Sequence, residues 1–200
     1  MQTYRAEETA ELLFNFPDGL NWSELDKQGV KLPVRMKFVD IVIEREKDIL
    51  LVEIKDPSHS RCPDKERNTY LRRLTDNSVL TQELTPKARD SYLYLHLMAR
   101  DSKPFKYVVL LGLDAFDPDR QKAIMFGFKD RLLTDIREES FEAWKRRHIA
   151  DCVVLSVESW NQHFPEWPLR REAPAVALAS ESVTQCPPSN SSVLPTAKAR

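Results

Sequence analysis

Apolar side chains recur at every second position in two neighbouring segments of the chain, residues 34–44 and 49–55. A period of two residues is typical of β-strands, and here both sides of each segment carry apolar positions. We therefore predict a β-hairpin that is buried on both faces, or nearly so. Three charged residues interrupt the pattern: Asp40 in the first strand, and Glu53 and Lys55 in the second.

The length of the turn within residues 45–48 decides which residues of the hairpin face each other. A loop of two or four residues sets Asp40 opposite Glu53, whereas a loop of three residues shifts the pairing by one position. Facing side chains lie about 4.5–5.5 Å apart at Cβ. Burying two carboxylates so close together costs several kcal/mol unless a cation compensates. A divalent cation with oxygen and water ligands is the expected compensation.

Asp40, followed after twelve residues by Glu53-Ile54-Lys55 on a strand pair, resembles the PD-(D/E)xK nuclease superfamily. The residue before Asp40 is Val39, where the family pattern has proline. The resemblance spans roughly residues 4–165. It implies an α/β fold in which helices flank a mixed central β-sheet, the restriction-endonuclease-like arrangement.

The resemblance also implies a chemistry for these residues. Asp40 and Glu53 would bind Mg²⁺ (or Mn²⁺), with the backbone carbonyl of Ile54 as a further ligand, and Lys55 would orient the attacking water or stabilise the phosphate. The implied activity is that of a metal-dependent endonuclease that hydrolyses phosphodiester bonds, with DNA as the first expectation. Two alternatives stay open. One is a nuclease-like domain without activity that binds nucleic acid or a partner protein, and the other is an unrelated interaction domain in which the carboxylates are solvated.

Residues 4–16 are predicted to form an amphipathic helix. Glutamates lie near its start, which suits the helix dipole, and the buried side would come from the apolar residues of 12–16. The family resembled opens with a helix that carries a glutamate of the site. We therefore assign Glu11 to the candidate catalytic residues.

The remaining pattern alternates helices with strands. Apolar runs predict strands over residues 106–113 and 152–158, and helical spacing predicts helices over residues 64–74, 85–100, 118–133, 137–147 and 156–164. Basic side chains follow the hairpin directly, so they are candidates for phosphate contacts. These candidates are Arg61, Arg67 and Arg72. The resemblance adds Lys87, because in that family the helix after this strand often carries a residue that points back at the site.

Composition narrows the class of protein. The chain of 200 residues has a formal net charge of −1, so nucleic-acid contacts would have to come from a local patch. We expect one domain over residues 1–171 and a disordered tail over 172–200, which is rich in proline, serine and alanine. Three cysteines and the lack of a long apolar run favour a cytoplasmic protein that does not enter a membrane. The small domain has no obvious separate module that reads sequence, so we expect target choice to come from a partner protein or a homodimer, or from DNA structure.

Zinc is the rival metal. His59 and Cys62 form one closely spaced pair, and His148 and Cys152 form another. Structural zinc takes four ligands from two such pairs. The second pair straddles a predicted boundary between helix and strand, which makes zinc the weaker hypothesis.

Overall fold

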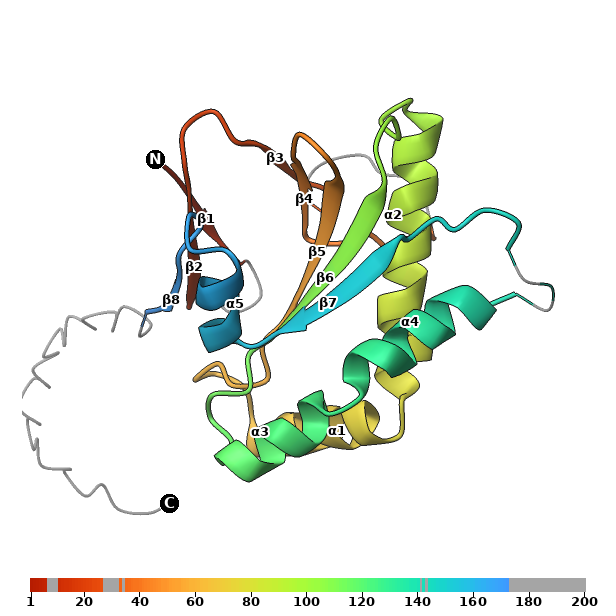
Figure 1. Ribbon diagram of the computed structural model, residues 1–200. Helices are drawn as coiled ribbons and strands as arrows, with labels where there is room; N and C mark the ends of the chain where they lie inside the picture. Colours follow the sequence, from red (N-terminus) through yellow and green to blue (C-terminus); the bar gives the residue numbers. More distant parts are fainter. Residues whose placement is uncertain (7–10, 27–32, 34, 141, 143, 173–200) are drawn as a thin grey trace, which may run out of the picture.

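A mixed five-stranded sheet forms the centre of the computed structural model, which describes residues 1–6, 11–26, 33, 35–140, 142 and 144–172 (Figure 1). Its strands lie in the order β3 (Asn21–Glu24), β4 (Ile41–Glu44), β5 (Ile49–Lys55), β6 (Phe105–Leu111) and β7 (Asp151–Leu155). The pairs β3–β4 and β4–β5 are antiparallel, whereas β5–β6 and β6–β7 are parallel. The prediction of an α/β fold with a mixed central sheet is confirmed. The predicted tail lies outside the described residues apart from Glu172.

The predicted hairpin is confirmed over β4 and β5 together with its register. Residues 35–40 of the predicted first strand are not in a strand, because the backbone amides of Lys37 and Val39 bond to side chains of helix α2 (Thr85–Leu97) and not to a neighbouring strand. Ile41 pairs with Val52 and Glu44 with Ile49, which is the pairing of a loop with two or four residues. Every residue of β5 is buried except Lys55, because β4 and β6 flank this strand and both faces of the sheet are covered.

The predicted N-terminal helix is wrong. A second sheet forms there from β1 (Gln2–Arg5), β2 (Leu12–Phe16) and β8 (Leu169–Arg171), with β2 in the middle and antiparallel to both neighbours. A short apolar run fits either a helix or a strand buried on both sides, and long-range pairing with β8 decides for the strand. The other glutamates near the predicted start, Glu7 and Glu8, lie outside the described residues.

All helices of the described residues follow β5 in the chain. They are α1 (Asp64–Thr75), the short π-helix η1 (Leu80–Leu84), α2 (Thr85–Leu97), α3 (Pro118–Met125), α4 (Phe128–Glu138) and α5 (Val157–His163). The helix predicted over residues 118–133 is split at Gly127, whose φ of 64° is the left-handed conformation that glycine adopts readily. The helix predicted over 137–147 is wrong beyond the end of α4 at Glu138 for the residues that the structure describes.

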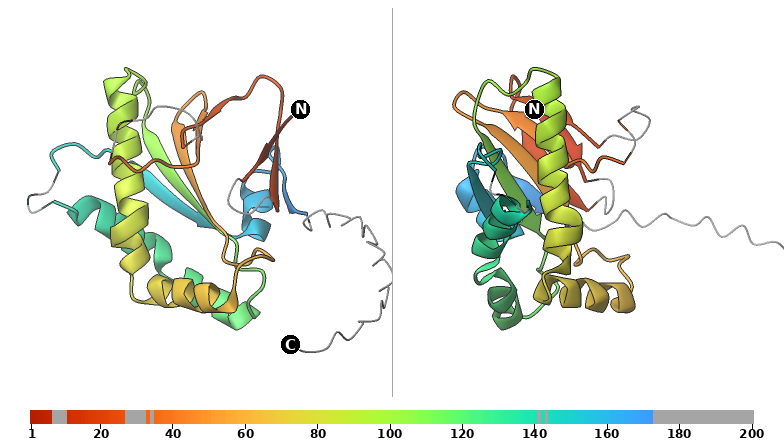
Figure 2. Two further views of the ribbon diagram at one scale, coloured as in Figure 1. Left: turned by 180° about the vertical axis from the view of Figure 1, so that it is seen from behind. Right: turned by 90° about the vertical axis from the view of Figure 1, so that its right-hand side faces the viewer.

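The two faces of the central sheet bury separate cores. Helices α1, α2 and α4 cover one face, where Leu51 and Val109 pack against Leu74, Ala88 and Leu132. The small sheet and α5 cover the other face, where Phe14 and Trp160 form part of the second core. Figure 2 shows the same layering from two other directions. No helix among the described ranges has both the length and the apolar character that a membrane span requires.

Candidate functional site

The two carboxylates of the hairpin converge on the face of the sheet covered by α2. Asp40 lies on a bend directly before β4, and its Oδ2 atom accepts a hydrogen bond of 2.6 Å from the backbone amide of Ile54. Glu53 lies in β5 and is fully buried. The Nζ atom of Lys87 lies 2.8 Å from Glu53 Oε1 and 3.7 Å from Asp40 Oδ1. One ammonium group therefore faces both carboxylates.

Glu53 is the most unusual ionisable group of the site. Burial and the nearby Asp40 carboxylate raise its pKa to about 7, although Lys55 and Lys87 act in the opposite direction. Lys55 Nζ lies 3.1 Å from Glu53 Oε1, so two ammonium groups approach the same oxygen. These contacts are ion pairs, and by geometric criteria both carboxylate oxygens lack a hydrogen-bond partner among the described residues. A buried carboxylate in this state is well suited to bind a cation.

Helix α2 positions Lys87 and also fixes the chain that leads to Asp40. The Asp90 carboxylate accepts a hydrogen bond of 2.8 Å from the backbone amide of Lys37, and the Ser91 hydroxyl accepts one of 3.0 Å from the backbone amide of Val39. Burial would lower the pKa of Lys87, but Glu53 and Asp40 outweigh it and raise that pKa. Lys87 therefore stays charged at neutral pH.

Lys55 connects the carboxylates with a small polar pocket. Its Nζ atom lies 3.3 Å from Glu83 Oε2, and Arg73 Nη2 lies 2.6 Å from Glu83 Oε1. The pocket has a volume of about 250 Å³. Its lining includes Lys55, Tyr70, Arg73, Glu83, His59 and Cys62. A larger pocket of about 530 Å³ borders Tyr92, Trp144 and His148, but neither Asp40 nor Glu53 lines it.

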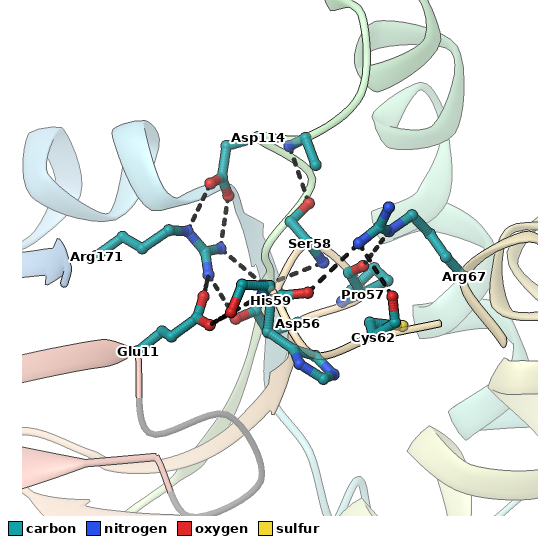
Figure 3. A network of polar contacts seen from close by, with 11 residues as sticks. Glu11, Asp56, Pro57, Ser58, His59, Cys62, Arg67, Asp114 and Arg171 are labelled. Carbon is teal, nitrogen blue, oxygen red and sulfur yellow. Dashed lines mark hydrogen bonds and ion pairs between the residues drawn. The ribbon is translucent and has the colours of Figure 1, made fainter. Parts of the chain in front are cut away.

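Glu11 belongs to a different cluster (Figure 3). It directly precedes β2 and is almost fully buried. Its Oε1 atom accepts hydrogen bonds from the backbone amide and the hydroxyl of Ser60, at 2.9 and 2.5 Å, and its Oε2 atom accepts one of 3.1 Å from Arg171. Burial raises the pKa of Glu11, but these contacts outweigh it and lower that pKa. The described contacts give Glu11 an organising role for the loop that follows β5.

Arg171 is the centre of this cluster. Its guanidinium donates hydrogen bonds of 2.7 and 2.8 Å to the two carboxylate oxygens of Asp56, and of 2.6 and 2.8 Å to those of Asp114. Bidentate pairs of this kind are the strong form of an arginine–carboxylate contact. They join β8 to the end of β5 and to the segment after β6, so the small sheet braces the strand that carries Glu53 and Lys55.

The basic residues predicted to contact phosphates do not gather in one place. Lys87 is at the carboxylates. Arg67 donates hydrogen bonds to the backbone carbonyls of Pro57, His59 and Cys62, which fixes the loop after β5 (Figure 3). Arg61 is exposed in that loop, and Arg72 is exposed on α1, where it lines a groove of about 530 Å³ shared with α3.

Glu83 was not among the predicted site residues, and Arg73 was not singled out within the basic stretch that follows the hairpin. Glu83 precedes Lys87 by four residues, and this spacing places both side chains on one face of a regular helix. That signal was available. Arg73 stands among several basic residues of α1, and nothing in the sequence distinguishes it from Arg72.

The described residues fit a magnesium site with few protein ligands. No group of three His, Cys, Asp or Glu side chains within the described ranges is arranged to hold a metal. Mg²⁺ is commonly held by one or two carboxylates and completes its shell with water. Asp40 and Glu53 supply such a pair. The carboxylate oxygens of Glu53 are buried and lack hydrogen-bond partners among the described residues. For zinc, His59, Cys62, His148 and Cys152 do not come together as a group that could hold a metal within the described ranges.

Comparisons of the chain with protein-family models, with curated proteins and with solved structures find no match.

Proposed function

We propose that the chain is a metal-dependent nuclease of the PD-(D/E)xK type with a restriction-endonuclease-like fold. The observation that carries this proposal is a fully buried Glu53 that faces Asp40 and two lysines at the end of a central hairpin. Burying two carboxylates so close together costs free energy even beside two ammonium groups, so a gain in binding or catalysis is the simplest physical reason for it. The proposed substrate is nucleic acid, with DNA as the first candidate.

In this proposal the residues have separate roles. Asp40, Glu53 and the backbone carbonyl of Ile54 would hold Mg²⁺ or Mn²⁺. Such an ion lowers the pKa of a bound water and offsets the charge that develops on the phosphate. Lys55 places its ammonium group beside Glu53 and at the rim of the polar pocket, where it orients the attacking water or binds a phosphate oxygen. Lys87 keeps the carboxylate pair compensated before a metal arrives.

One observation favours a second candidate function. The Lys87 ammonium already compensates both carboxylates, at 2.8 Å from Glu53 and 3.7 Å from Asp40. A chain that relies on this internal cation has less need of a metal. The alternative is therefore a nuclease-like domain that binds nucleic acid or a partner protein without cutting.

The deciding experiment is cleavage of plasmid, linear and single-stranded DNA, and of RNA, with Mg²⁺, with Mn²⁺ and with EDTA. Asp40→Ala and Lys55→Ala are compared with the wild type, and Lys47→Ala serves as the control because Lys47 is exposed in the hairpin turn. We expect metal-dependent cutting by the wild type and by Lys47→Ala that both site variants lose. Cutting that survives both site substitutions contradicts the proposal, and binding without cutting by the wild type supports the alternative.

A further inference from the structure

The Glu83 carboxylate lies between two cations. Its Oε2 atom is 3.3 Å from Lys55 Nζ, and its Oε1 atom is 2.6 Å from Arg73 Nη2. Burial would raise the pKa of Glu83, but Lys55 and Arg73 outweigh it and lower that pKa, so the group is an anion at neutral pH. The contact is therefore an anion held by two cations beside Glu53.

A carboxylate in this position resembles part of a phosphate. Both groups present two oxygens on one side, and the fork of an arginine side chain matches either of them. Arg73 comes from α1, Lys55 from β5 and Glu83 from η1, so three separate elements meet at this point. The arrangement is an anion site that already contains an anion of the chain itself.

The pocket around these residues also suits a small anion. Its volume of about 250 Å³ lies below the range of roughly 300–1,000 Å³ that is typical for pockets of drug-sized ligands. The hydroxyl of Tyr70, which lines the pocket, is buried without a hydrogen-bond partner among the described residues. A phosphate oxygen would give this donor a partner.

We propose that Lys55, Arg73 and Tyr70 form a binding subsite for a phosphate group of the nucleic-acid strand, and that Glu83 occupies this subsite while no strand is bound. The inference rests on the proposed function, because it takes nucleic acid as the ligand. It adds two contact residues and a residue that competes with the substrate. A bound phosphate takes the place of the Glu83 carboxylate between the two cations.

The helix that carries Glu83 is suited to such an exchange. Glu83 belongs to η1, a π-helical segment of five residues at the start of α2. Single π-helical turns are rare in proteins, and those that occur often lie at functional sites. A change from π-helical to α-helical hydrogen bonding in this segment would rotate the Glu83 side chain relative to Lys55.

The test uses two substitutions that break the same ion pair from opposite sides. Binding of a labelled single-stranded oligonucleotide is measured by fluorescence anisotropy in EDTA, so that no metal-dependent cutting occurs. Glu83→Gln removes the competing anion and is expected to tighten binding by about tenfold, the scale of one charge-assisted contact. Arg73→Gln removes a phosphate ligand and is expected to weaken binding by a similar factor.

A purely structural ion pair gives a different result. Loss of either partner would then change affinity in the same direction, or not at all, and this outcome overturns the subsite. Thermal unfolding of both variants shows whether the fold is intact. Tyr70→Phe provides an independent check, because it removes only the unpartnered hydroxyl and is expected to weaken binding several-fold. Inorganic phosphate should compete with the oligonucleotide more strongly in Glu83→Gln than in the wild type.

The outcome can be separated from that of the cleavage experiment. Opposite effects of Glu83→Gln and Arg73→Gln without any cutting by the wild type would support the subsite and contradict the nuclease activity. Metal-dependent cutting with equal effects of both substitutions would support the nuclease and overturn the subsite. No measurable binding by any variant overturns the subsite as well.

Discussion

The Oδ2 atom of Asp40 accepts a hydrogen bond of 2.6 Å from the backbone amide of Ile54, the residue between Glu53 and Lys55. This bond attaches the first carboxylate of the site to the strand that carries the second. Asp40 therefore has one oxygen with a structural role and another that lies 3.7 Å from Lys87. Its charge and its hydrogen bond are separable by substitution.

We predict that Asp40→Asn abolishes metal binding and retains most of the stability. The asparagine side-chain oxygen can still accept the hydrogen bond from Ile54, whereas Asp40→Ala leaves that buried amide without its partner. The alanine variant should therefore lose about 1–3 kcal/mol more of the free energy of unfolding than the asparagine variant. Urea unfolding with and without Mg²⁺ measures both effects. Asp119→Asn on α3 is the control, since Asp119 is exposed. Equal stability of the two Asp40 variants would contradict the role of the Ile54 bond.

Glu53 predicts a specific pH dependence of stability. Its pKa is about 7 in the folded chain because burial disfavours the charged form, against an ordinary value of 4.5. Between these values the unfolded chain releases the proton while the folded chain retains it. The free energy of unfolding should therefore fall as pH rises through this window, by about 3 kcal/mol in total. The measurement is urea unfolding in EDTA from pH 4 to 8.

Glu53→Gln isolates this contribution, because the other ionisable groups titrate in both proteins. We expect the difference in stability between Glu53→Gln and the wild type to move in favour of the variant as pH rises from 4.5 to 7. A difference that stays constant with pH contradicts the raised pKa. Saturating Mg²⁺ should reduce the difference, since a bound cation favours the ionised form of Glu53.

The hairpin was predictable because its pattern is local. Alternation within β4 and β5 and a turn at residues 45–48 predicted that Asp40 faces Glu53 if the loop has two or four residues, and the structure has that register. The structure of the N-terminal segment was not predictable in this way, because its apolar run is too short to distinguish a helix from a strand buried on both sides. Pairing of β2 with β8 decides it, and those strands are far apart in the sequence. Contacts between residues far apart in the sequence, such as that between Glu11 and Arg171, produce no periodic pattern of apolar and polar positions.

The two lysines of the site are predicted to behave differently. The Lys87 ammonium competes with any cation that binds Asp40 and Glu53, whereas Lys55 also faces Glu83. Lys87→Met should therefore tighten Mg²⁺ binding, and Lys55→Met should abolish cutting while Mg²⁺ still binds. Without metal, Lys87→Met should cost about 3 kcal/mol above pH 7, the lower end for removing one partner of a buried ion pair, because the Lys55 ammonium still lies 3.1 Å from Glu53. The cost should shrink near pH 5, where Glu53 is protonated.

Titration calorimetry with Mg²⁺ and urea unfolding at both pH values test the lysine predictions. Lys122→Met is the control, because Lys122 is exposed on α3. Weaker Mg²⁺ binding by Lys87→Met would show that this ammonium supports the metal instead of competing with it.

Gly112 is predicted to be required for the contact between Asp56 and Arg171. A Cβ atom at this position would lie 2.2 Å from Asp56 Oδ1 and 3.1 Å from Arg171 Nη2, and the Gly112 amide donates a hydrogen bond of 2.8 Å to the carbonyl of Lys55. Gly112→Ala should therefore displace the Asp56 carboxylate and cost about 1–3 kcal/mol. Because the clash is with that carboxylate, the double variant Gly112→Ala/Asp56→Ala should lose less stability than the two single losses together. Urea unfolding of the four proteins measures this coupling, and strict additivity would mean that Gly112 is needed for another reason.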